Sequence, residues 1–293
     1  MAVSIDLPTT QRAIIANDEL DYSIQDDVSL PPLSPDSVII RTSHVGLNPV
    51  DTKMVGPFVG AGATYGVDCA GEIVAIGSDV PASRRLELGD RVAGCADGME
   101  AMRPRSGAFA EYASVHGDMV FKLPEGMSLA VGAGMPLRIA TAALALFHSL
   151  GLPSELLDEQ YQKQGEAFDV LVYGGATSTD VGLEPYPDTA ATRKAVIPDW
   201  ILVTWMRGLP ISWPEPFGTE AAKPGYQAFG REVMPKLHRL FEEGKLSSHP
   251  VREEKDGFEG LLDGVDLLRK GKVRGEKLVY RTQERRSVVA AAA

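Results

Sequence analysis

The sequence predicts an α/β protein in which a β-barrel is followed by a shortened α/β domain. Up to about residue 120, short strand-like runs alternate with glycine and proline turns, as in a partly open barrel or sandwich. Residues 139–150 are apolar on almost every face, which is typical of a helix buried between two domains. Residues 168–173 form an apolar strand that enters a turn of small residues, as at the start of an α/β domain.

The remaining elements are indicated by their apolar patterns and by the residues that end them. In the first part we expect strands at 37–45, 69–76, 91–94 and 108–115, with Gly46 and Gly77 closing the first two. Further along we expect a surface helix or loop at 154–164, helices at 225–244 and 258–268 with a kink at Pro235, and a last strand at 277–280. The expected domains are therefore 10–150 and 151–275, with a C-terminal strand and loose tail at 276–293.

Composition excludes several classes of protein. The net charge of -11 argues against a nucleic-acid partner, which would attract a basic patch. No apolar run reaches the roughly 18 residues that span a bilayer, and the first residues lack the pattern of a secretory signal. Cys69 and Cys95 are the only cysteines, too few for a disulfide framework or a four-thiolate zinc site. We expect a cytoplasmic protein of 293 residues that binds neither nucleic acid nor membrane.

The turn that begins at Gly174 has the composition of a phosphate-binding turn. Such a turn leads into a helix whose free N–H groups hold the pyrophosphate of a dinucleotide. Here the residues after Thr179 instead form a short strand, 180–184, which two prolines follow. Adjacent parallel strands need a crossover of about a dozen residues or more. The sequence therefore predicts that an internal block of about two βαβ units is missing between Thr179 and Asp180.

Three segments resemble a known superfamily when they are taken in order. They are Gly66–Gly77 (GVDCAGEIVAIG), Gly89–Val92 (GDRV) and Gly107–Tyr112 (GAFAEY). Together they resemble the GroES-like catalytic domain of the medium-chain dehydrogenases/reductases, in which a Rossmann domain follows. The resemblance implies a GroES-like β-barrel catalytic domain and a truncated Rossmann-like cofactor domain.

The resemblance also bears on zinc. Zinc-dependent members carry a ligating Cys at the position of Asn48 and a ligating His at the position of Val67. Catalytic zinc needs three protein ligands, so two of them are missing here. The five histidines of the chain have no ligand-like spacing. We therefore expect no metal site, and a member of the zinc-free branch.

Within that branch, the segments 48–53, 183–185 and 198–200 resemble the trans-acting enoyl reductases that serve fungal polyketide synthases. This implies a monomer that transfers hydride from NADPH to the α,β-double bond of a polyketide intermediate. The implied partner is the acyl carrier of a polyketide synthase or hybrid synthase. Such chemistry needs hydrogen-bond donors or a cation to stabilise the developing enolate, and it needs no zinc.

The resemblance implies site residues as well, with Lys53 as the candidate catalytic residue near the nicotinamide. The residues implied for the cofactor are Val50, Asp51, Thr52, Lys53, Thr141, Ala176, Thr177, Ser178, Thr179, Leu183, Glu184, Val273 and Arg274. Those implied for the substrate are Arg138, Ile139, Ala140, Thr141, Ala142, Ala143, Leu144, Ala145, Val203, Thr204, Trp205, Met206 and Arg207.

Each assignment has an alternative. Lys53 can be a solvated loop lysine, Thr141 a helix threonine bonded to its own backbone, and 176–179 a plain Ser/Thr turn. The whole chain can be a catalytically impaired truncated homologue, or a zinc-free quinone oxidoreductase. If the chain is made as written, the missing strands predict weak or absent NADPH binding and poor solubility, because the remaining strands and helices expose apolar faces.

Overall fold

The computed structural model describes residues 2–17, 21–54, 56–162, 202–213 and 218–282. Its main sheet has eight strands, of which six follow the order β11-β12-β4-β5-β6-β8, while β1 pairs with β5 and β7 with β4. The bounds are β1 Val3–Ser4, β4 Ser37–Gly46, β5 Asp68–Ile76, β6 Arg91–Cys95, β7 Tyr112–His116, β8 Val120–Lys122, β11 Val251–Glu254 and β12 Lys277–Arg281.

Strand β4 is the centre of this sheet. It pairs with β5 along one edge. Along the other edge it pairs first with β7, over Ser37–Arg41, and then with β12, over His44–Gly46. Eight of its ten residues are buried, including the apolar Val38, Ile39, Ile40 and Val45 and the polar Thr42 and His44.

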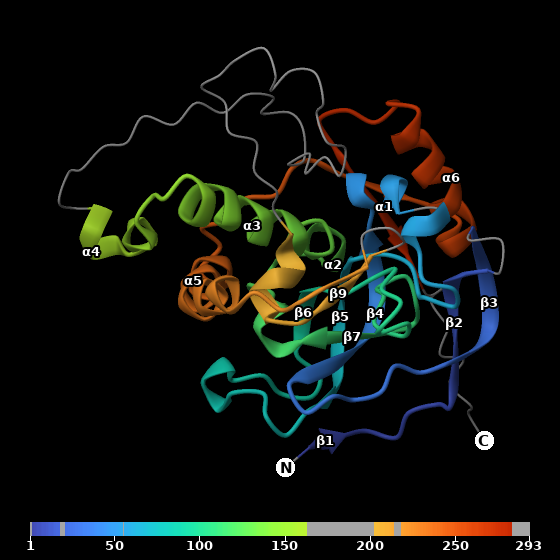
Figure 1. Cartoon of the computed structure of the whole chain (residues 1–293), viewed down its shortest axis with the longest axis horizontal. Coiled ribbons are helices and arrows are strands. Elements are labelled where there is room, and N and C mark those ends of the chain that lie inside the picture. The colour runs from blue at the N-terminus through green and yellow to red at the C-terminus, as the bar shows by residue number, and fades with distance from the viewer. Residues whose placement is uncertain (1, 18–20, 55, 163–201, 214–217, 283–293) are drawn as a thin grey trace.

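The C-terminal part of the chain returns to the N-terminal sheet. Strand β11, helix α6 (Gly257–Arg269) and strand β12 form a βαβ unit, and β11–β12 is the one parallel pair among the described residues. Strand β12 then pairs antiparallel with β4, so that Val279 lies opposite Gly46. Helix α6 lies beside the short helix α1 (Pro49–Lys53) above the edge of the sheet (Figure 1). The last described strand therefore completes the sheet that the first strands begin.

The other elements surround the sheet. Two hairpin-like pairs join β2 (Thr10–Ala16) to β3 (Tyr22–Ser29) and β9 (Ile211–Ser212) to β10 (Thr219–Glu220). The remaining α-helices are α2 (Leu129–Gly132), α3 (Pro136–Ala143), α4 (Glu159–Gln162) and α5 (Pro224–Glu242). A π-helical turn covers Leu144–Ser149, and 3-10 turns cover Gly56–Phe58, Ala82–Arg84, Gly117–Met119, Ser154–Leu157 and Val203–Arg207 (η6).

Most expected elements are confirmed within one or two residues. The strands expected at 37–45, 69–76, 91–94 and 277–280 are β4, β5, β6 and β12, and the two long helices are α5 and α6. Helix α5 runs through Pro235 without a break. The strand expected at 108–115 begins only at Tyr112, so its first half was predicted wrongly. Residues 108–110 bond to other partners instead: the N–H groups of Ala108 and Phe109 donate to the carbonyls of Gly66 and Tyr65.

The apolar helix expected at 139–150 is present with a different outline. Helix α3 begins earlier, at Pro136, and the π-helical turn follows it without a gap. With α2 it makes a 21-residue stretch, Leu129–Ser149, of mean hydropathy 1.6, which is long and apolar enough to cross a membrane. That finding contradicts the expectation that no stretch reaches this length. However, 61% of the apolar window is buried inside the fold, as in a core helix.

Candidate functional site

A cleft lies between the N-terminal sheet and the elements that follow it. Its walls come from the start of α1, the loop after β6, helix α3, η6 and strand β9. The lining residues are 48–50, 54, 67, 95–100, 119, 137, 138, 141, 202–204, 207 and 211–213. The surface is largely apolar, with methionines at 54, 99 and 119 and Trp213, and charged groups gather on one wall. Such a mixture suits an apolar ligand that carries a few polar atoms.

Six of the predicted site residues line this cleft: Val50, Arg138, Thr141, Val203, Thr204 and Arg207. The rest of the predicted α1 group is not part of the cleft lining: Asp51 is fully buried, and Thr52 and Lys53 are half-buried at the end of α1, next to the lining residue Met54. The hydroxyl of Thr141 donates to the carbonyl of Leu137 at 2.7 Å, which is the backbone bond of the alternative interpretation. Because Thr141 also faces the cleft, its oxygen keeps a lone pair for a ligand.

The other predicted residues lie away from the cleft lining or outside the described residues. Ile139, Ala140, Ala143 and Leu144 are buried in the core, as are Trp205 and Met206, whereas Ala142 and Ala145 are half-buried. Val273 is half-buried and Arg274 is exposed on the turn after α6. The predicted phosphate turn (Ala176, Thr177, Ser178, Thr179) and Leu183 with Glu184 lie outside the described residues.

Helix α1 is fixed by its own sequence. Pro49 occupies its first position, where the missing N–H costs nothing, and the Asp51 carboxylate accepts the backbone N–H of Asn48 at 2.7 Å. The hydroxyl of Tyr65 donates to the carbonyl of Asp51. Asn48 and Val50 are thereby held against the cleft, since the helix cannot turn without breaking these bonds.

Beneath α1 lies a buried polar cluster of Asn48, Asp68 and Lys277. The Lys277 ammonium donates to Oδ1 of Asn48 and, at 3.2 Å, to Oδ2 of Asp68. Asp68 also accepts Nδ2 of Asn48 at 3.0 Å and the backbone N–H of Leu137 at 2.9 Å. Sequence reasoning missed the role of Lys277, for which the sequence offered only its place at the start of a strand.

Burial governs the titration of Asp51. Loss of solvent raises the pKa of its carboxyl to about 7, although the Asn48 N–H and the Lys277 charge favour the ionised form. One carboxyl oxygen has no hydrogen-bond partner among the described residues. A folded-state pKa above the unfolded value means that the folded protein holds the extra proton between about pH 4 and 7, so stability falls as pH rises through that window.

We predict that Asp51→Asn removes this loss. Between pH 5 and pH 8 the free energy of unfolding of the variant should rise relative to the wild type by about 1–3 kcal/mol, because its amide does not ionise. Urea unfolding at the two pH values measures the difference. The exposed Asp27 provides the matched control, Asp27→Asn, which should leave the pH dependence as it is. If the free energy of unfolding changes equally with pH in the wild type and in Asp51→Asn, the raised pKa of Asp51 is contradicted.

A network of ion pairs forms the charged wall of the cleft. The Arg103 guanidinium bonds to Asp97 at 3.1 Å and to Glu100 at 3.4 Å, and Arg207 also pairs with Asp97. Arg103 further donates to the carbonyl of Pro210 at 3.3 Å. The network therefore ties the loop after β6 to the loop after η6. Asp97, Glu100 and Arg103 were not predicted, because no spacing in the sequence brings them to Arg207.

The two positions that correspond to lost zinc ligands both face the cleft. They carry the amide of Asn48 and the apolar side chain of Val67. The described residues contain no group of three or more His, Cys, Asp or Glu side chains close enough to hold a metal ion. For a nicotinamide, the apolar wall with Val50 and the Thr141 oxygen are suitable contacts. The described residues thus fit a nicotinamide ring, and the predicted phosphate turn lies outside them.

Comparison with known proteins agrees with these features. Residues 34–125 match the alcohol dehydrogenase GroES-like domain. Trans-enoyl reductase buaC of Petromyces alliaceus is 33% identical, with 96% of this chain and 99% of that protein aligned. Trans-enoyl reductase milB of Cordyceps militaris is 32% identical, covering 94% and 99%. The enoyl reductase component lovC of the lovastatin nonaketide synthase of Aspergillus terreus is 30% identical, covering 94% and 97%.

Solved structures show the same fold. The human synaptic vesicle membrane protein VAT-1 homolog-like protein aligns with a TM-score of 0.60 at 18% identity, over 94% of this chain and 99% of that one. The CurK enoyl reductase aligns with a TM-score of 0.56 at 16% identity, over 93% and 99%. The expected mixed α/β fold, with its GroES-like and Rossmann-like parts, is thereby confirmed.

The alignments also measure what the chain lacks. The buaC alignment extends over 361 positions, whereas this chain has 293 residues, so at least 68 positions of the relative have no counterpart here. Because the alignment nevertheless reaches nearly both ends of each protein, the shortfall is internal. By its GroES-like domain and its near full-length identity to these enzymes, the chain belongs to the fungal trans-enoyl reductases of the medium-chain dehydrogenase/reductase superfamily.

Proposed function

We propose that this protein is an enoyl reductase that acts in trans on the acyl carrier of a polyketide synthase, with NADPH as its reductant. The substrate is the α,β-unsaturated thioester of a carrier-bound polyketide intermediate, and the protein acts as a monomer in the cytoplasm. The observation that carries the proposal is the cleft itself: an apolar wall from α1 and α3, with Asn48 and Val67 where zinc ligands would be needed for alcohol oxidation.

The residues of the chain have separate tasks in this proposal. NADPH supplies a hydride for the β carbon of the alkene. The apolar wall excludes water and accommodates the acyl chain, which strengthens every polar contact inside the cleft. The Thr141 oxygen accepts a hydrogen bond from the ligand, while the thioester oxygen, where negative charge develops, needs a donor or a cation. We assign that part to Lys53, at the last turn of α1 and next to Met54 of the cleft lining.

The substitution Lys53→Met tests this assignment. It should lower kcat/KM for an enoyl thioester by about a hundredfold, because a charge that stabilises the transition state is lost. Thermal unfolding is measured for each variant, so that a loss of folded protein is separated from a loss of catalysis. The exposed Lys270 gives the control, Lys270→Met, for which we expect wild-type kinetics. Equal kinetics for both variants would remove Lys53 from the mechanism.

A second candidate is a catalytically impaired homologue, and the internal shortfall of at least 68 positions favours it. Sequencing the transcript across codons 179 and 180 would show whether the block is present in the expressed message. Purified protein is then assayed for NADPH consumption with a short enoyl thioester and with a quinone. Turnover of the thioester supports the reductase, turnover of the quinone alone supports an oxidoreductase of the quinone type, and no turnover supports the impaired homologue. Stoichiometric zinc in the native protein would contradict the proposed branch.

A further inference from the structure

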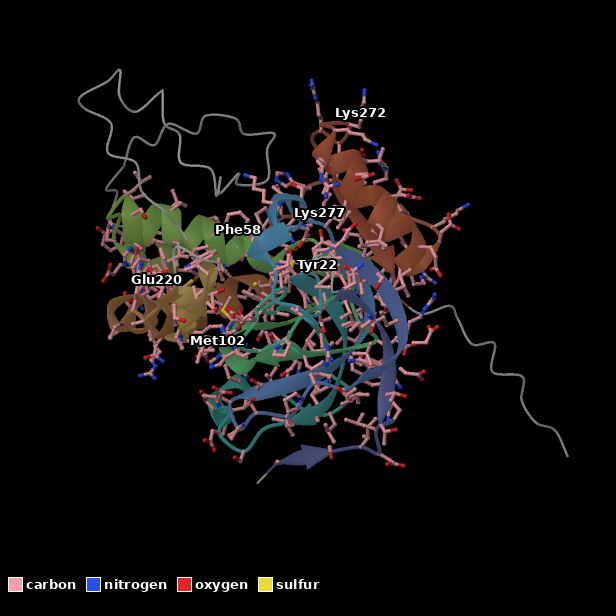
Figure 2. The ribbon with its side chains drawn as sticks, turned by 45° about the vertical axis from the view of Figure 1, so that its right-hand side comes forward. Tyr22, Phe58, Met102, Glu220, Lys272 and Lys277 are labelled. Carbon is pink, nitrogen blue, oxygen red and sulfur yellow. The ribbon has the colours of Figure 1, made fainter. Side chains whose placement is uncertain are left out.

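Lys277 is a buried lysine, and Gly46 and Gly134 leave room for its side chain. It is the first residue of β12, and its side chain is 6% exposed. A Cβ atom at Gly46 would lie 2.3 Å from the carbonyl oxygen of Ala133 and 3.0 Å from the Cε of Lys277, and one at Gly134 would lie 3.2 Å from the Cγ of Lys277. The methylene groups of Lys277 therefore occupy space that side chains at positions 46 and 134 would partly fill. Figure 2 shows Lys277 within the body of the protein, whereas Lys272, five residues earlier, points into solvent.

The ammonium of Lys277 lies between α1 and α3, two helices that line the cleft. Lys277 bonds to Asn48, the residue that precedes α1. It also pairs with Asp68, which is fully buried and which receives the N–H of Leu137 in the first turn of α3. Asn48 in turn donates to Asp68. One ammonium and one carboxylate thus join α1, β5, α3 and β12.

A buried ion pair of this kind is poor evidence for stability. Removing two charges from water costs about as much as their attraction returns, and a well-packed apolar pair is often as stable. Such a pair does impose geometry, because each donor and acceptor must be satisfied in one arrangement. In this cluster the arrangement fixes the distance between Asn48 and Leu137, both of which line the cleft.

We propose that Lys277 and Asp68 are positioning residues, which hold α1 and α3 at the separation that the nicotinamide of the cofactor requires. The identity of the cofactor rests on the proposed function, and the mechanical coupling of α1 to α3 does not. Neither side chain is among the residues that line the cleft, so both act through Asn48 and Leu137.

The test uses the full chain with three variants. Lys277→Met leaves Asp68 buried without its cation, and Lys277→Met/Asp68→Asn removes both charges, so that the second variant folds if the first does not. Lys272→Met is the matched control on the exposed part of the same segment. Amide hydrogen exchange of residues 48–54 and 137–143 should increase about tenfold or more in the double variant, with β5 and β6 unchanged.

NADPH affinity separates positioning from a merely structural role. We expect the double variant to recover the melting temperature of the wild type, while NADPH at about 10 mM, enough to occupy a site with a millimolar dissociation constant, protects residues 48–54 and 137–143 from exchange in the wild type and no longer protects them in the double variant. The proposal is overturned if residues 48–54 and 137–143 of the double variant exchange at the wild-type rate. It is also overturned if the double variant recovers NADPH binding together with the melting temperature. If the wild type itself binds no NADPH, the proposed function fails, and the exchange measurement still decides whether Lys277 and Asp68 couple α1 to α3.

Discussion

Replacing Gly66 by alanine is expected to destabilise the protein by at least about 3 kcal/mol, because two costs add at one position. Gly66 has a φ of +82°, a conformation that L side chains rarely adopt. A Cβ atom there would lie 2.1 Å from the ring of Phe109. Phe109 is fully buried and packs edge-on against Tyr65 at 5.2 Å, so it cannot move aside without opening the core. Urea unfolding of purified protein measures the loss.

Gly126 provides a matched control for this prediction. Its φ of +84° is nearly the same, and an added Cβ would have no atom within 4 Å. Gly126→Ala therefore incurs the backbone cost alone, about 1–2 kcal/mol. The difference between the two variants isolates the contact with Phe109. Equal destabilisation of both would show that the ring adjusts and that the core near the cleft is less rigid than its packing implies.

The second large effect concerns the cofactor. We expect this chain to bind NADPH with a dissociation constant of about 1 mM or weaker. Inserting the corresponding block of buaC between Thr179 and Asp180 should strengthen binding about a thousandfold, or about 4 kcal/mol. The physical reason is that a dinucleotide site needs the strands that follow the glycine turn and an acidic or basic residue about 20 positions beyond it to contact the ribose. Isothermal titration of both proteins gives the two constants.

Chain length is controlled by a second insertion with the same block in scrambled order. That protein should bind NADPH no better than the original chain. A micromolar constant for the original chain would contradict the prediction, and it would mean that the residues after Thr179 complete a cofactor site by another route. If both inserted proteins bind NADPH weakly, the missing block belongs at another position in the chain.

The sequence predicted the sheet well, for a local reason. Strands β4, β5 and β6 each contain a short apolar run and end at or near a glycine or a turn, so each carries its own boundary. The prediction of a strand at 108–115 was wrong in its first half. There the N–H groups of Ala108 and Phe109 donate to the carbonyls of Gly66 and Tyr65, and no local sequence pattern indicates these partners. The apolar stretch at 129–149 was underestimated because it is divided among α2, α3 and the π-helical turn, each of which is short.

The site was predicted less completely because its contacts connect distant parts of the chain. Lys277 reaches Asp68 across 209 residues and Asn48 across 229, and neither separation leaves a trace in sequence spacing. Val50, Arg138, Thr141 and Arg207 were identified through resemblance, and the cleft does bring them together. Lys53 remains a prediction, as do the residues implied for the phosphates.

The pairing of β12 with β4 has a consequence for biosynthesis. A ribosome releases β4 long before β12, so the N-terminal sheet stays incomplete until the 230 residues between Gly46 and Lys277 have emerged. Both partners lie outside the middle of the gene. An in-frame excision between them would spare the two strands that close the sheet, so the N-terminal half could still close.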